Sequence, residues 1–174
     1  MIKSDYIYQK ANDILANSDT KDPIRIAKSL GITVHHNDEF EKLLGLYTVI
    51  NNKRAIVLNS RLEEYMTRMV VAHEIGHDCL HRDIAKSETL QEFVLFDMKN
   101  NLEYEANVFA AHLLIDTNEF LKLAYDGVDA VNMSQRFCVN INLVLMKAND
   151  LIHLGYDLRM PMQAKSNFMK DIKI

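Results

Sequence analysis

The stretch Val71-Ala72-His73-Glu74-Ile75-Gly76-His77 contains an H-E-x-x-H sequence. Two histidines four residues apart lie about 40° apart around a helix and one turn apart along it, so both imidazoles can reach one zinc ion. The glutamate of the pattern can take a proton from water at the metal and pass it to a leaving amine. We therefore predict that His73 and His77 bind Zn²⁺ and that Glu74 is the catalytic base.

The residues around this motif predict a helix over about residues 61–81, whose buried face carries both histidines. Its apolar stripe consists of Leu62, Met66, Met69, Val70, His73, His77 and Leu80. The alternative is a buried helix with two ordinary core histidines. His81 continues the series, but it lies about 12 Å along the axis from His73, so we interpret it as a helix-end residue. The longer pattern H-E-x-x-H-x-x-G-x-x-H fails because Leu80 and Asp83 occupy its last two defined positions.

The third ligand must therefore come from elsewhere, and a second helix beginning near Asn100 offers it. The apolar stripe of that helix is Leu102, Ala106, Phe109, Ala110, Leu113 and Leu114. Glu103 lies about 60° from the centre of the stripe, and Glu105 about 100° away on the other side. We predict Glu103 as the ligand and keep Glu105 in reserve. Asn107, one turn after Glu103, is placed to hydrogen-bond a neighbouring ligand.

Composition sets the broad class of the protein. The 174 residues are 48% hydrophobic and 25% charged, with a net charge of −4, which suits a globular protein and does not favour nucleic-acid binding through bulk positive charge. No apolar run reaches the roughly 20 residues of a membrane span, and the first residues lack the apolar core of a signal peptide. Two isolated cysteines, Cys79 and Cys138, fit a reducing cytosol, although one disulfide is compatible with the sequence. We expect a cytoplasmic protein.

The segments before the motif predict two helices and a three-stranded sheet. Apolar residues have helical spacing over residues 4–17, and Asp22-Pro23 begins a short second helix that Gly31 ends. The strand-like runs are residues 32–34, 44–50 and 54–59, the last two joined by Asn51-Asn52-Lys53 as a hairpin.

The segments after the second motif helix predict further helices, at residues 117–126 and then as a helix–turn–helix over residues 128–154. The fold class is α+β. We divide the chain into a metallopeptidase domain (1–120), a helical extension packed on it (121–158) and a tail (159–174). A DNA-binding role for the extension is an alternative, but its second helix carries Lys147 beside Asp150 and few other basic residues.

H-E-I-G-H followed by E-Y-E-A-N-V-F-A-A-H-L-L-I resembles the ImmA/IrrE family of zinc metallopeptidases, over about residues 5–120. The resemblance implies a gluzincin-like domain with zinc ligands His73, His77 and Glu103 and catalytic Glu74. It also implies an anti-repressor function, the cleavage of a helix–turn–helix repressor at one site to relieve repression in a phage, a mobile element or a stress response. Family members often end the second helix with Leu-Leu-Met-Pro, whereas this chain has Leu-Leu-Ile-Asp.

Two other functions remain open at this point. The protein could be a regulator that binds a repressor or DNA and uses zinc only structurally, or a metal-dependent partner in a toxin–antitoxin pair. A structural zinc site has four protein ligands, whereas a catalytic site leaves one position to water. The residue that stabilises the oxyanion is unassigned, with Tyr47, His112 and Tyr125 as candidates.

Overall fold

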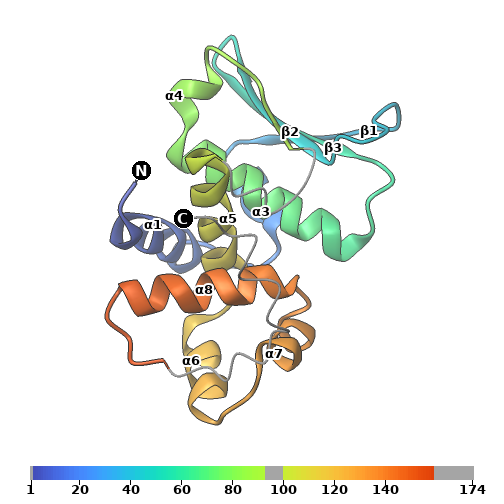
Figure 1. Ribbon diagram of the computed structural model, residues 1–174. Helices are drawn as coiled ribbons and strands as arrows, with labels where there is room; N and C mark the ends of the chain where they lie inside the picture. Colours follow the sequence, from blue (N-terminus) through green and yellow to red (C-terminus); the bar gives the residue numbers. More distant parts are fainter. Residues whose placement is uncertain (1, 93–99, 159–174) are drawn as a thin grey trace.

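The structure is a computed structural model that describes residues 2–92 and 100–158 (Figure 1). The predicted tail and part of the connection after the H-E-x-x-H helix lie outside the described residues. The elements are α1 (Ser4–Ala16), α2 (Pro23–Ser29), β1 (Thr33–Asn37), β2 (Gly45–Ile50), β3 (Lys53–Asn59), α3 (Glu64–Leu80), α4 (Arg82–Ala85), β4 (Leu90–Glu92), α5 (Asn101–Leu114), α6 (Thr117–Tyr125), α7 (Ala130–Phe137) and α8 (Ile141–His153). Among the described residues, none of these helices is both long and apolar enough to cross a membrane.

The sheet has four strands in the order β1-β3-β2-β4, so the prediction of three strands was wrong. β4 pairs antiparallel with the start of β2, and its three residues are too few to show the alternation by which strands are detected in a sequence. The predicted hairpin is confirmed, because β2 and β3 pair antiparallel and Asn51 and Asn52 have φ angles of 51° and 61°. Two successive left-handed residues make the type of turn that matches strand twist, and asparagine tolerates that conformation best after glycine.

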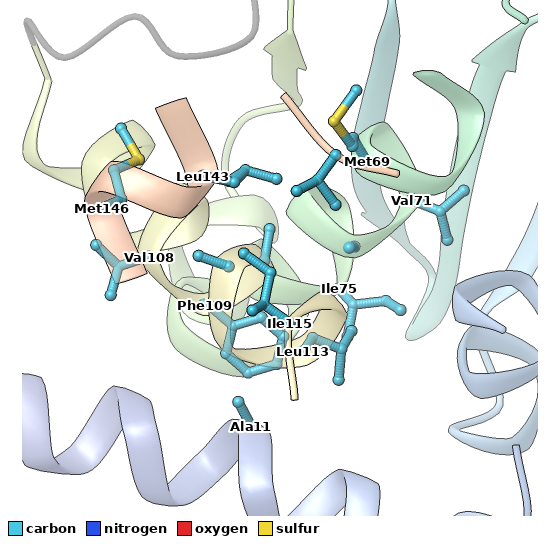
Figure 2. Packing of buried hydrophobic residues seen from close by; sticks show 14 of the residues in the cluster. Ala11, Met69, Val71, Ile75, Val108, Phe109, Leu113, Ile115, Leu143 and Met146 are labelled. Carbon is cyan, nitrogen blue, oxygen red and sulfur yellow. The ribbon is translucent and has the colours of Figure 1, made fainter. Parts of the chain in front are cut away.

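The core lies where α3 and α5 cross, with the sheet on one side of α3 and α8 against α5 (Figure 1). Every residue of α3 from Met69 to Asp78 is buried, because the sheet, α2 and α5 all pack on this helix. Figure 2 shows Ile75 of α3 close to Phe109 and Leu113 of α5, with Ala11 of α1 beside them. A helix covered on all sides is apolar all round, so the polar residues that α3 does bury need partners.

Short polar side chains begin five of the described helices, α7 among them, where Asp129 accepts from the backbone N–H of Asn132. Asp22, Asn100, Asp116 and Asn140 likewise each accept a hydrogen bond from a backbone N–H in the first turn of the helix that follows. The helix α5 ends at Leu114 because Ile115 is extended, and Asp116 directly after it caps α6. Such caps contribute about 1 kcal/mol each.

The helix α8 is tied to α5 and to the start of α6 by a polar cluster of the buried His112, Lys147 and Asp150 with the half-buried Thr117. His112 Nε2 lies 2.7 Å from Asp150 Oδ2, and Lys147 Nζ lies 2.8 Å from both His112 Nδ1 and Thr117 Oγ1. Lys147 and Asp150 are at most 1% exposed, so neither side chain is presented to a DNA groove. The proposed boundary at residue 120 stays a prediction.

This cluster makes stability depend on pH. Burial lowers the pKa of His112 from 6.5 to about 4, so the unfolded chain takes up this proton before the folded one. The contribution of neutral His112 to the unfolding free energy is therefore fully present above about pH 6.5. It falls by on the order of 3 kcal/mol as the pH is lowered towards 4. We expect His112→Gln to cost more unfolding free energy at pH 7 than at pH 4, as measured by urea titration. An equal cost at both pH values would contradict this assignment.

Candidate metal centre

Three predicted ligands meet between α3 and α5. His73 Nε2 lies 3.0 Å from His77 Nε2 and 3.0 Å from Glu103 Oε2, and His77 Nε2 lies 3.5 Å from the same oxygen. These three residues form a group of potential metal ligands. Ligand atoms around a tetrahedral zinc ion stand ~3.3 Å apart, given zinc–ligand distances of about 2.0–2.1 Å. The spacing of the two nitrogens and the oxygen therefore fits zinc.

The helix crossing that brings these ligands together depends on Gly76. A Cβ atom at this position would lie 3.1 Å from both the Cα and the carbonyl oxygen of Ala106, and 3.3 Å from Cβ of Phe109. The two helices are therefore in close contact, and a side chain at residue 76 would push the backbone of α5 away. This close approach allows a glutamate from α5 to reach imidazoles on α3.

The protonation state of the histidines also suits metal binding. Burial, together with the neighbouring His73, lowers the pKa of His77 to about 4, despite the opposing effect of Glu103. His77 is therefore neutral at neutral pH, which is the form that binds metals. His73 Nδ1 lies 3.0 Å from Asn107 Oδ1, and an amide oxygen only accepts, so the ring proton is on Nδ1 and the lone pair of Nε2 faces the other two ligands. Asn107 thus occupies the outer position predicted for it.

Glu74 follows His73 directly and is completely buried. Gly45, the first residue of β2, lies against it, since a Cβ atom there would be 3.1 Å from Glu74 Oε1 and 2.7 Å from Cγ1 of Val70. The glycine lets the strand backbone approach the carboxylate. Glu103 differs from Glu74 in being 18% exposed, so the ligand group meets solvent on the Glu103 side.

Glu105, the reserve ligand, is not part of the group. Its Oε2 lies 2.9 Å from His81 Nε2, and Oε1 accepts from the backbone N–H of Ile2. His81 ends α3 as predicted, but it is buried, and its Nδ1 lies 2.9 Å from Nδ1 of His77. Burial lowers the pKa of His81, against the effect of Glu105. The four-residue spacing of the three histidines was the signal available for this contact, which we had not predicted.

The orientation of α3 against the sheet is set by a second buried carboxylate, that of Asp78. It accepts from the hydroxyl of Tyr47 at 2.5 Å, from Arg54 at 2.9 Å and from Arg82 at 2.7 Å. Burial and the hydrogen bond to Asp78 raise the pKa of Tyr47. The hydroxyl of Tyr47 and both ring nitrogens of His112 are thus engaged elsewhere, while Tyr125 is 64% exposed. The oxyanion-stabilising residue stays unassigned.

Comparisons with known proteins identify the family of this chain. Residues 27–149, more than half of the chain, match the model of peptidase family M78, described as the IrrE N-terminal-like domain. An uncharacterized immunity region protein 2 of Bacillus phage phi105 is 32% identical over 96 residues, which are 55% of this chain and 60% of that protein. A Mycobacterium tuberculosis transcriptional regulator has a similar fold, with a TM-score of 0.54 and 15% identity over 82% of this chain and 46% of its own.

The chain thus spans less than two thirds of the length of either relative. From the family match and the phage relative we conclude that this chain belongs to the ImmA/IrrE family, peptidase family M78, a family of metallopeptidases.

Proposed function

We propose that the protein is a zinc-dependent endopeptidase that cleaves a helix–turn–helix repressor at one site and so relieves repression. The observation that carries the proposal is the group formed by His73, His77 and Glu103. Glu74, the residue after His73 on α3, is buried against Gly45 at the start of β2. Similarity to a protein named for the immunity region of a phage supports a repressor as the substrate.

The residues have distinct roles in this proposal. His73, His77 and Glu103 hold the zinc ion, which when bound supplies a Lewis acid and lowers the pKa of water in the site to about 7. Glu74 accepts a proton from the attacking water on its carboxylate and returns it to the departing peptide nitrogen. Asn107 holds the proton of His73 on Nδ1, so that Nε2 keeps its lone pair for the metal.

The ligand count favours an enzyme over a structural zinc protein. Among residues 2–92 and 100–158, three side chains form the group, whereas structural zinc sites have four protein ligands. The alternatives, a regulator that binds a repressor without cutting it and a component of a toxin–antitoxin pair, predict no cleavage. Burial of Lys147 in the second helix of the helix–turn–helix segment argues against direct DNA binding by that helix.

The test is to incubate the zinc-loaded protein with the helix–turn–helix repressor encoded beside its gene. We expect two fragments from a single cut, no cut in the presence of a zinc chelator, and recovery of cleavage when zinc is added back. Electrophoresis and mass spectrometry of the products measure this. A repressor that stays intact but co-elutes with the protein would overturn the peptidase proposal in favour of the regulator.

A further inference from the structure

A chain of hydrogen bonds runs from Glu105 on α5 to the metal ligand His77 on α3. Glu105 Oε2 lies 2.9 Å from His81 Nε2, and His81 Nδ1 lies 2.9 Å from His77 Nδ1. Both Glu105 and His81 are at most 3% exposed. Water therefore does not compete with these contacts. Which atom donates and which accepts is decided by the carboxylate and the two imidazoles alone.

The direction of each hydrogen bond follows from the carboxylate at the end. A carboxylate only accepts, so the ring proton of neutral His81 is on Nε2, and its Nδ1 has a lone pair. That lone pair requires His77 to donate from Nδ1. The lone pair of His77 Nε2 then points towards His73 and Glu103, which is the orientation that a metal ligand needs.

We infer that His81 and Glu105 are positioning residues for His77. They fix its tautomer, and the carboxylate of Glu105 polarises it through the imidazole of His81. This inference rests on the metal-binding part of the proposed function. Asn107 performs the same task for His73 with a neutral oxygen. The two imidazole ligands therefore have different outer partners, and His77 is the one polarised by an anion.

The arrangement also accounts for the spacing of the residues. Glu103 and Glu105 are two positions apart on α5 and so point in opposite directions around the helix. One reaches the ligand group, and the other reaches His81, a helical turn beyond His77. Outer hydrogen-bond partners of metal-bound histidines are typically worth a 10–100-fold change in metal affinity.

The test compares His81→Leu and Glu105→Gln with wild type, using His112→Gln as the matched control. His112 is also a buried histidine paired with a carboxylate, Asp150, but it is hydrogen-bonded to none of the ligands. The zinc dissociation constant is measured by competition with a chromophoric chelator, and the unfolding free energy of each metal-free protein by urea. Nitrogen-15 shifts of the imidazoles in the metal-free protein report which nitrogen of His77 carries the proton.

We expect His81→Leu to bind zinc about 10–100-fold more weakly. In Glu105→Gln the amide oxygen can still accept from His81 but carries no charge, so its zinc affinity should fall by a smaller factor. His112→Gln should lose stability while its zinc affinity stays within about twofold. The nitrogen-15 shifts should place the proton of His77 on Nδ1 in wild type. In His81→Leu they should show a mixture of the Nδ1–H and Nε2–H tautomers of neutral His77. Glu105→Gln keeps the size of the side chain, so it serves if His81→Leu fails to fold.

Unchanged zinc affinity in both variants, with wild type binding zinc, would overturn this inference alone. A wild type that binds no zinc would overturn it together with the proposed function. Zinc binding that weakens as expected, in a protein that cuts no repressor, would support the inference and reject the peptidase.

Discussion

Replacing Glu74 with glutamine is expected to abolish peptide-bond cleavage and to leave zinc binding intact. The amide has nearly the shape of the carboxylate, so it fits the buried position against Gly45, but it accepts no proton from water. General acid–base catalysis of this kind contributes about 10²–10⁴-fold, so the rate should fall by at least that range. Glu74 is not among the three grouped ligands, so the zinc content, measured by atomic absorption, should stay at the wild-type value.

The control for this variant is Glu64→Gln, an exposed glutamate in the first turn of the same helix. It should cleave repressor at the wild-type rate. If Glu74→Gln did so too, another group would have to be the base. A Glu74→Gln protein that lost both cleavage and zinc would instead indicate that the carboxylate contributes to metal binding.

Replacing Glu103 with alanine is expected to weaken zinc binding by more than about 100-fold, beyond the effect of losing an outer partner. The reason is that Glu103 Oε2 lies 3.0 Å from His73 Nε2 and 3.5 Å from His77 Nε2. Zinc at 1,000 times its dissociation constant adds about 4 kcal/mol to folding stability. The wild type should therefore melt at a higher temperature with zinc than without, and Glu103→Ala should lose this rise.

Glu105→Ala distinguishes the ligand from the reserve ligand. The carboxylate of Glu105 is hydrogen-bonded to His81 and is not one of the three grouped ligands. The variant should therefore bind zinc more weakly than wild type but more tightly than Glu103→Ala. The reverse order, with Glu105→Ala failing to bind and Glu103→Ala binding well, would exchange the two assignments.

The sequence was informative where local patterns specify the structure. The hairpin at Asn51-Asn52 could be predicted because two left-handed residues are needed in such a turn. The angular position of Glu103 on a helical wheel was enough to select it as the ligand candidate, since burial of one stripe fixes which residues face α3. Each of these inferences needed only one element and its periodicity.

Pairings between elements were not accessible in the same way. Lys147 and His112 lie on different helices, and their contact in the core depends on how α8 crosses α5. Glu105 and His81 meet for a similar reason, because Gly76 lets α5 approach α3 closely. The three residues of β4 are assigned as a strand only through their pairing with β2. Such contacts depend on tertiary geometry, for which a single sequence has no periodic signal.

The absence of a side chain at Gly76 also bears on the thermodynamics of metal uptake. Because the helices touch there, the backbone positions of residues 73, 77 and 103 are set by packing of the apolar core. The entropy of ordering these ligands is then lost when the chain folds, and an arriving cation encounters a preorganised cage. Exchange of the ion can therefore proceed without unfolding of the surrounding protein.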